Sequence, residues 1–160
     1  MRKITDEWGF AAFIPRPWTP EEIAESCEAT ADLLEDGHWT RGSWIRATDT
    51  TTGDYYDMTD ATGVETEDFV VTYCIEGAMA AVLGLDPNSM AEGSSERDLL
   101  MECPVYDAVL TTINDDTYHG CDLMGWNDSE GREESEVVDV LRRTAKRVLG
   151  VGPDQMTVHP

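Results

Sequence analysis

Apolar residues at helical spacing predict four principal helices along the chain. The first begins at Thr19, where T-P-E-E is typical of a capping box, and ends at Gly37, a residue suited to a left-handed cap. Two more are expected at residues 103–113 and 137–149, where apolar side chains lie three or four positions apart. The remaining helix, over residues 67–83, has an interior of small side chains and ends at a glycine.

Residues 38–68 follow a different pattern. Threonine, aromatic and aspartate residues dominate there, and T-T-G-D at residues 51–54 is a turn signal. This composition predicts a small β-hairpin, with strands near residues 43–48 and 54–58. A polar loop is expected from Asp57 to Asp68.

The whole chain, residues 1–160, is expected to form a single domain. Residues 1–18 are an irregular segment, residues 19–150 the helical core and residues 151–160 a loose tail. The predicted fold is mainly α: a compact bundle of about four helices with a small inserted β-hairpin. No apolar run approaches the ~20 residues that a membrane span needs. The N-terminus lacks the apolar region of a signal peptide, so we expect a cytoplasmic protein.

The charge is strongly acidic and uneven. The chain has 33 acidic and 11 basic residues, a net charge of -22, and residues 41–130 hold 19 acids and three bases, a net charge of -16. Such a field repels the phosphate backbone, which disfavours direct nucleic-acid binding, and it favours a basic protein partner. DNA mimicry is a variant of this expectation, whereas salt adaptation or simple solubility would give the same composition without a partner.

The sequence predicts no metal, no cofactor and no assigned catalytic residue. Its four cysteines are expected to be reduced, since a chain with a sizeable core does not need disulfides; they are Cys27, Cys74, Cys103 and Cys121. His119 and Cys121 are zinc-ligand types, but their spacing is not that of a zinc knuckle. The motifs H-E-x-x-H and G-x-S-x-G and a glycine-rich phosphate loop are also missing from the sequence.

Two residues of the predicted helix at 67–83 allow alternative interpretations. A glycine inside a helix costs ~1 kcal/mol relative to alanine, so Gly77 indicates tight packing or a bound group. Cys74 is interpreted as a small buried hydrophobic residue. The alternative makes Cys74 a nucleophile with His119 or His38 as its base.

The W-N-D sequence at residues 126–128 precedes the last helix and also has two interpretations. In the structural one, Trp126 fills the core while Asn127 or Asp128 binds free amides of the turn and the helix start. Arg132 would then pair with Asp128. In the functional one, Asp128 is a catalytic acid or a metal ligand. We favour the structural interpretation, because no second catalytic group is fixed nearby by spacing.

The aromatic residues around the predicted hairpin are expected to cover one end of the helical bundle, and those that are exposed would form a protein-binding patch. Aromatic residues alternate there with arginines, as in single-strand binding surfaces, but the surrounding acidity opposes that function. Tryptophan, tyrosine and arginine also dominate protein-binding hot spots. The residues assigned to the patch are Trp39, Arg41, Trp44, Asp54, Asp57 and Asp60, and Tyr55 and Tyr56 lie among them.

Three segments resemble an uncharacterised family of small proteins that is widespread in actinobacteria and their phages. They are L-L-E-D-G-H-W-T-R-G at residues 33–42, Y-C-I-E-G-A-M-A-A at residues 73–81 and W-N-D-x-x-G-R-x-x-x-E-V at residues 126–137. The chain departs from the family at Glu133, where a threonine cap is usual. The resemblance implies relatedness without an activity, and a phage origin would imply an accessory or host-directed role in the host cytoplasm.

These observations favour a non-enzymatic accessory or regulatory protein that binds a basic partner. The acidic middle of the chain and the missing catalytic motifs carry this expectation. The alternative is a small hydrolase or transferase that uses Cys74 or Asp128.

Overall fold

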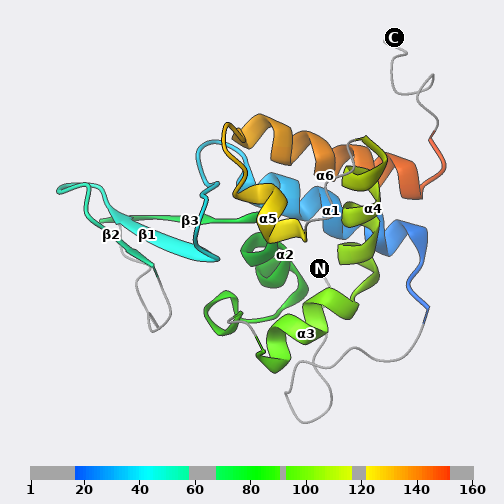
Figure 1. Ribbon diagram of the computed structural model, residues 1–160, viewed down its shortest axis with the longest axis horizontal. Coiled ribbons are helices and arrows are strands. Elements are labelled where there is room, and N and C mark those ends of the chain that lie inside the picture. Colours follow the sequence, from blue (N-terminus) through cyan, green and yellow to red (C-terminus); the bar gives the residue numbers. More distant parts are fainter. Residues whose placement is uncertain (1–16, 58–67, 91–92, 117–121, 152–160) are drawn as a thin grey trace.

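The computed structural model describes residues 17–57, 68–90, 93–116 and 122–151 (Figure 1). In chain order its elements are α1 (Pro20–Leu34), β1 (Ile45–Asp49), β2 (Tyr55–Asp57), β3 (Phe69–Tyr73), α2 (Ile75–Leu83), the 3-10 turn η1 (Pro87–Ser89), α3 (Ser95–Glu102), α4 (Pro104–Asp116), α5 (Leu123–Asn127) and α6 (Glu134–Val148). The prediction of a mainly α fold is confirmed, but these residues contain six α helices rather than about four, and three strands rather than two. None of these helices is long and apolar enough to cross a membrane.

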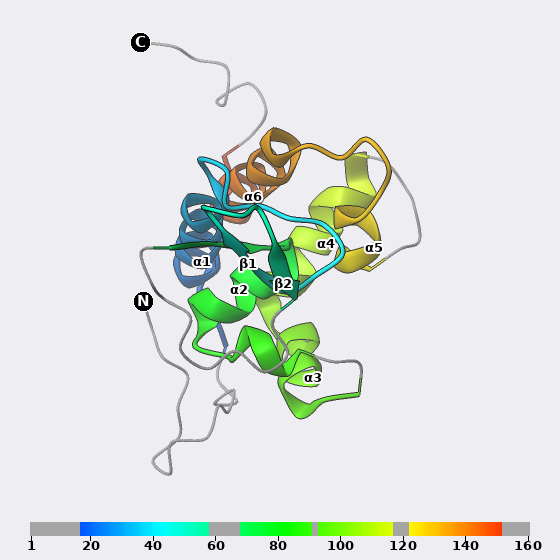
Figure 2. The ribbon, with the colours of Figure 1, turned by 90° about the vertical axis from the view of Figure 1, so that its left-hand side faces the viewer.

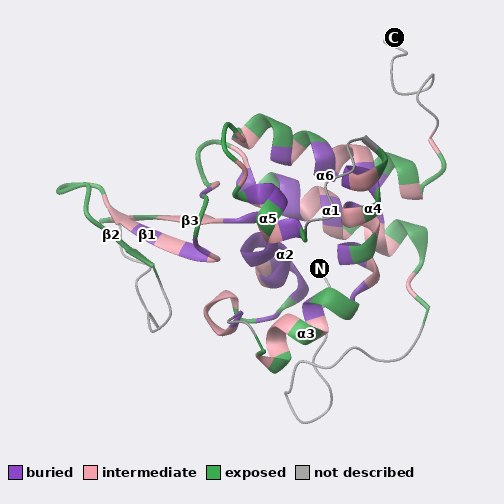
Figure 3. Ribbon diagram, in the orientation of Figure 1, coloured by how far each residue is buried: buried purple, intermediate pink, exposed green. Residues whose placement is uncertain are grey.

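Helices α1 and α6 lie side by side and bury their apolar faces against each other (Figures 1 and 3). Cys27 and Ala31 of α1, and Leu141 and Ala145 of α6, are at most 2% exposed. The small side chains let the two helices approach closely. The apolar stripes expected on both helices therefore face the core.

The predicted start of α1 is confirmed. The Oγ1 of Thr19 accepts a hydrogen bond from the N–H of Glu22 at 3.1 Å. The helix ends at Leu34, earlier than predicted, and Gly37 follows with a left-handed φ of 87°. The N–H of Gly37 donates to Oε1 of Glu134 at 2.8 Å, so the turn after α1 is tied to the start of α6.

Residues 69–73 form strand β3 instead of the beginning of a helix. The prediction of one helix over residues 67–83 is therefore wrong in its first half, because α2 begins at Ile75 with Cys74 as its N-cap. The run F-V-V-T-Y consists of aromatic and β-branched residues, which suit a strand, and it pairs antiparallel with β1. A single residue separates β3 from α2, so no turn sequence marks the boundary.

The sheet has the strand order β2-β1-β3 and extends away from the helical body (Figures 1 and 2). Strands β1 and β2 confirm the predicted hairpin. Asp49 holds its turn, since Oδ1 accepts hydrogen bonds from the N–H groups of Thr51 at 2.7 Å and Thr52 at 3.1 Å. Ile45 and Ala47 of β1 are buried in a small apolar cluster that is separate from the main core.

Helix α2 lies at the centre of the body, and eight of its nine residues are buried (Figure 3). At Gly77 an added Cβ would lie 1.8 Å from the carbonyl oxygen of Trp44, so any larger residue would collide with backbone. Of the two interpretations of this glycine, the structure supports tight packing. Helix α2 is thereby pressed against the segment that leads into β1.

The segment before α6 contains a further short helix that the sequence did not predict. Asp122 caps α5, because its Oδ1 accepts the hydrogen bond of the amide three residues later at 2.7 Å. Trp126 and Asn127 are consequently helical, and Asp128 is the C-cap of α5. The expectation that these three residues form a turn leading directly into α6 is therefore wrong.

Candidate functional site

Asn127 joins three segments that are distant in the sequence. Its Oδ1 accepts hydrogen bonds from Nε1 of Trp39 at 2.8 Å and from the N–H of Ile75 at 3.0 Å. Its Nδ2 donates to the carbonyl oxygen of Thr40 at 3.2 Å. Asn127 is fully buried, so these bonds satisfy polar groups that water cannot reach. The side chain ties α5 to the start of α2 and to the segment before β1.

Asp128 extends this arrangement at the surface. Its Oδ1 accepts hydrogen bonds from the N–H of Gly42 at 2.9 Å and from Nδ2 of Asn127 at 2.9 Å. We call Trp39, Thr40, Gly42, Asn127 and Asp128 the Asn127 hub. The predicted local bonds to the turn and to the start of α6 are thus replaced by bonds to residues 39–42, more than 80 positions earlier.

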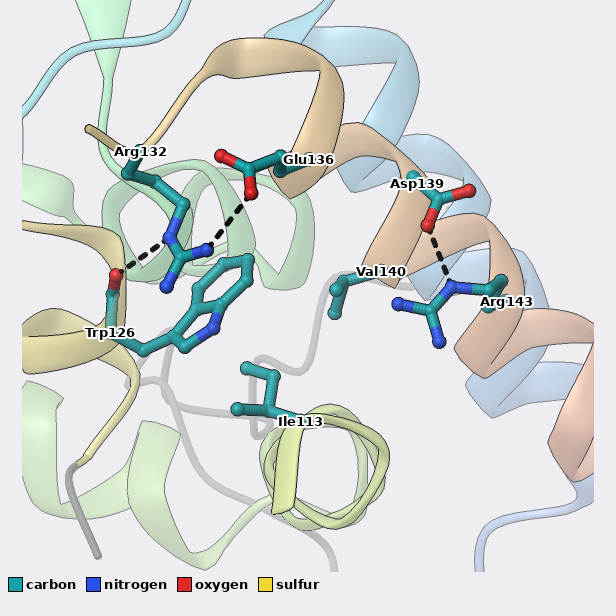
Figure 4. A pocket seen from close by; sticks show the side chains of 7 residues that line it. All are labelled: Ile113, Trp126, Arg132, Glu136, Asp139, Val140 and Arg143. Atoms are coloured by element: carbon teal, nitrogen blue, oxygen red, sulfur yellow. Dashed lines mark hydrogen bonds and ion pairs between the residues drawn. The ribbon is translucent and has the colours of Figure 1, made fainter. Parts of the chain in front are cut away.

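Trp126 fills the core beside the hub, as only 4% of it is exposed. Arg132 covers one face of the indole, with its Cζ 4.0 Å from the ring centroid (Figure 4). The guanidinium donates from Nε to the carbonyl oxygen of Trp126 at 3.0 Å and from Nη1 to Glu136 at 3.3 Å. The expected pairing of Arg132 with Asp128 is therefore wrong: Arg132 closes over Trp126 instead.

An open hollow of about 250 Å³ adjoins Trp126 (Figure 4). Its lining residues are Ile113, Trp126, Arg132, Glu136, Asp139, Val140 and Arg143. Two acid–base pairs form its rim, Arg132 with Glu136 at 3.3 Å and Arg143 with Asp139 at 2.6 Å. Because each pair is neutral overall, the rim offers no excess charge that would select an ionic ligand.

The geometry at Cys74 suits a buried structural thiol. The residue is fully buried, and its Sγ accepts a hydrogen bond from the N–H of Gly77 at 3.3 Å. Burial raises the pKa of the Cys74 thiol to about 12, so the nucleophilic thiolate is scarce at neutral pH. His119 and Cys121, the other candidates for a reactive or metal-binding group, lie outside the described residues. The residues that the structure describes contain no group of three or more potential metal ligands.

One buried carboxylate was not predicted from the sequence. Glu76, in the first turn of α2, is fully buried. Its Oε2 accepts from Nε1 of Trp44 at 3.3 Å, and its Oε1 accepts from the hydroxyl of Tyr106 at 3.2 Å. Arg97 lies 3.6 Å away, at ion-pair distance. Burial raises the pKa of Glu76, and the charge of Arg97 opposes this shift. The detectable signal was one acid within the apolar run C-I-E-G-A-M-A-A.

The six residues predicted to bind a partner are not brought together. Trp39 and Trp44 are half-buried, and their indole N–H groups are used by Asn127 and Glu76. Arg41 donates to the carbonyl oxygen of Ser129 at 3.2 Å, beside the Asn127 hub. Only Asp54 and Asp57 lie on the sheet, and Asp60 lies outside the described residues.

The exposed aromatic side chains of the sheet are tyrosines. Tyr55 is 59% exposed and Tyr56 is 58% exposed, and Val70 on β3 is 40% exposed. We call Asp54, Tyr55, Tyr56, Asp57, Asp68 and Val70 the sheet surface. The sheet that carries them extends away from the helices (Figures 1 and 3).

Both tyrosines are held in place by neighbours. Arg46 lies over the ring of Tyr55, with its Cζ 4.3 Å from the centroid, and its Nε donates to Asp57 at 2.9 Å. Tyr56 lies on the other face of the sheet, where its ring centroid is 6.3 Å from that of Phe69. Aromatic side chains that are both exposed and positioned lose little conformational entropy when a partner covers them.

A family model, described as a family of unknown function (DUF6197), matches residues 18–147 of the chain. No curated protein and no solved structure matches the chain.

Proposed function

The chain belongs to the DUF6197 family, and we propose that it is a non-enzymatic accessory protein that binds a basic protein partner through the sheet surface. The observation that carries this proposal is the exposure of Tyr55 and Tyr56 on a projecting, acidic sheet. Tyrosine supplies a large contact area at little entropic cost and is enriched in binding hot spots.

Charge supports a basic partner. The described residues of the sheet region, 45–57 and 68–73, contain four acids and one arginine, a net charge of -3. In the helical body, by contrast, the three arginines of α6 are paired with acids. Arg142 bonds to Asp32 at 3.0 Å and to Glu35 at 2.5 Å, and Arg143 bonds to Asp139. The acidic excess of the sheet therefore remains available to attract and orient a positively charged protein.

The distribution of exposed apolar area points to the same surface. Among the described residues, the exposed large hydrophobic side chains are Tyr55, Tyr56, Val70, Met101 and Leu149. Three of the five belong to the sheet surface, whereas Met101 and Leu149 are at the ends of different helices. Tyr55 and Val70 lie on one face of the sheet, on either side of Thr48, and Tyr56 lies on the other face. Exposed apolar side chains on neighbouring strands are more typical of a binding site than isolated ones.

The hydrolase or transferase alternative has less support. Cys74 is buried, and burial raises the pKa of its thiol. The carboxylate of Asp128 accepts a hydrogen bond from the N–H of Gly42. A DNA mimic would be the same proposal with a nucleic-acid-binding protein as the partner. If the chain is encoded by a phage, the partner is a basic host protein in the cytoplasm.

The test compares two matched double variants as baits. Each is incubated with lysate of the cells in which the chain naturally occurs. One carries Tyr55→Ser and Tyr56→Ser; the other carries Met101→Ser and Leu149→Ser and also removes two exposed apolar side chains. Mass spectrometry should identify a basic protein that binds the wild type and the second variant, is lost from the first, and elutes as salt rises. Equal capture by both variants would contradict the proposal.

A further inference from the structure

We infer that the partner binds as an extended segment of alternating basic and apolar residues, which adds a strand to the outer edge of β2. This inference rests on the proposed function and specifies how the sheet surface would be used. Its basis is the combination of strand order, backbone register, side-chain alternation and charge at β2. An added strand obtains affinity from main-chain hydrogen bonds and specificity from alternate side chains.

The register fixes which backbone groups of β2 point outward. The N–H of Asp49 donates to the carbonyl oxygen of Asp54 at 2.8 Å, whereas the N–H of Thr50 donates toward β3, to Asp68 at 2.9 Å. Hydrogen-bonded pairs alternate along an antiparallel ladder, so Tyr56 bonds to β1 through its partner Ala47. The N–H and C=O groups on either side of Tyr56 consequently point away from β1.

Those outward groups belong to Tyr55 and Asp57. Strand β2 stands at the end of the sheet order, and all three of its residues are exposed. Among the residues that the structure describes, no strand pairs with this edge, and two donors and two acceptors, spaced as in a strand, lie along it. An incoming strand could satisfy all four without disturbing the ladder between β1 and β2.

The two faces of β2 favour different side chains. Tyr55 and Asp57 share one face with Arg46, and they offer an aromatic ring and a carboxylate. A lysine or arginine opposite them would gain cation–π and ion-pair contacts. Tyr56 shares the other face with Phe69, where an apolar side chain would extend the cluster. Alternating basic and apolar residues match this arrangement.

The net charge selects a different protein over a second copy of the chain. An open strand edge can pair with the same edge of a second copy of the chain, and many proteins prevent this with lysine or proline on the edge. The D-Y-Y-D sequence at residues 54–57 contains neither. Two copies would bring together sheets whose described residues carry a net charge of -3, in chains of net charge -22. Electrostatic repulsion therefore opposes self-pairing, while a basic segment is attracted.

The decisive experiment measures amide hydrogen exchange by NMR while the full chain is titrated with a ten-residue peptide of alternating lysine and valine. At a peptide concentration about ten times the dissociation constant, exchange at Tyr55 and Asp57 should slow about tenfold, because only the free fraction exchanges. Exchange at Tyr56 should change little, since its amide already bonds to β1. A peptide with glutamate in place of lysine should cause no slowing.

Charge-matched variants locate the attraction. Asp54→Asn with Asp68→Asn removes two exposed charges from the sheet, one next to β2 and one next to β3, and Glu21→Gln with Glu25→Gln removes two exposed charges from α1. The first pair should weaken peptide binding about threefold at low salt, and the second should leave it nearly unchanged. Equal weakening by both pairs would overturn the placement of the basic segment at β2.

The outcomes separate this inference from the proposed function. Slowed exchange that alternates along β2 supports strand addition. Binding without alternation, or no binding of the lysine–valine peptide, overturns it. The proposed function fails if the Tyr55→Ser, Tyr56→Ser variant captures the same basic protein as the wild type. If the partner instead bound through side chains alone, the tyrosine variant would lose capture, but amide exchange along β2 would not slow in an alternating pattern.

Discussion

The Asn127 hub and the sheet surface use similar residue types for opposite purposes. In the hub, the indole of Trp39 and the amide of Asn127 bond to each other and to backbone, and Asn127 is fully buried. On the sheet surface, Tyr55 and Tyr56 are held by neighbours yet remain more than half exposed. The difference shows that aromatic and acidic residues indicate a binding site only where the fold leaves them uncovered. It also predicts that the two regions respond differently to substitution.

The largest loss of stability is expected for Trp126→Ala beside the hub. The substitution removes a side chain that is only 4% exposed and that Arg132 covers. Large aromatic truncations in cores cost about 3–5 kcal/mol. Urea unfolding of the variant and the wild type measures this loss. A cost below about 1 kcal/mol would contradict the assignment of Trp126 to the core.

A slightly smaller loss is expected for Asn127→Ala. It leaves the indole N–H of Trp39, the N–H of Ile75 and the carbonyl of Thr40 without their partner. An unsatisfied buried group costs about 1–3 kcal/mol, and the shared cavity makes the three costs less than additive. We expect about 3 kcal/mol in total, measured by urea unfolding.

Asp128→Ala is the control for the hub because it removes a bond at the surface. Its Oδ1 accepts from the amide of Gly42, and we expect about 0.5–1.5 kcal/mol of destabilisation with partner capture retained. Unchanged melting combined with lost capture would instead make Asp128 a site residue. That result would break the distinction between hub and sheet surface.

A pH-dependent effect is expected from Glu76. Burial raises its pKa, so the folded protein still binds a proton at pH values where the unfolded chain has lost it. Unfolding then releases this proton, and the free energy of unfolding falls as the pH rises through the folded pKa. A tenfold difference in proton affinity between the folded and unfolded states corresponds to about 1.4 kcal/mol.

Glu76→Gln isolates this contribution. The glutamine keeps an oxygen acceptor for Trp44 or Tyr106 but does not ionise, so the variant should gain stability relative to the wild type as the pH rises. Urea unfolding of both proteins from pH 4 to pH 8 measures the difference, in which the other carboxylates cancel. A difference that stays constant with pH would show that Glu76 does not titrate with a raised pKa in this range.

The parts of the fold that sequence analysis predicted depend on local chemistry. The cap at Thr19 and the turn held by Asp49 are determined by residues within three positions of each other. The stripe on α6 follows from helical periodicity over the length of one helix. Strand β3 was missed because its five residues directly precede α2 and carry no separating turn, so strand and helix were predicted as one element.

The candidate site was less predictable because its contacts are distant in the sequence. Asn127 bonds to Trp39 and to the amide of Ile75, which lie 88 and 52 positions away. Trp44 and Tyr55 both belong to the aromatic residues around the hairpin, yet only Tyr55 is exposed. The sequence pattern indicated the aromatic patch, while burial, which depends on how α2 packs, decided which members remain available.

The smallest effect on stability, and the largest on binding, is expected for the Tyr55→Ser, Tyr56→Ser pair. Both side chains are more than half exposed, and surface substitutions of this kind usually change stability by about 0.5 kcal/mol or less each. Thermal melting should therefore stay near that of the wild type, while capture of the basic partner is lost.

The Asn127→Ala variant should show the reverse: a lower melting temperature, with capture retained by the folded protein when it is assayed below that temperature. Melting curves and capture assays on the same four proteins, the two variants together with wild type and Asp128→Ala, measure both properties. If the tyrosine pair lowered the melting temperature as far as Asn127→Ala does, the tyrosines would stabilise the fold. The sheet surface would then no longer be supported as a binding site.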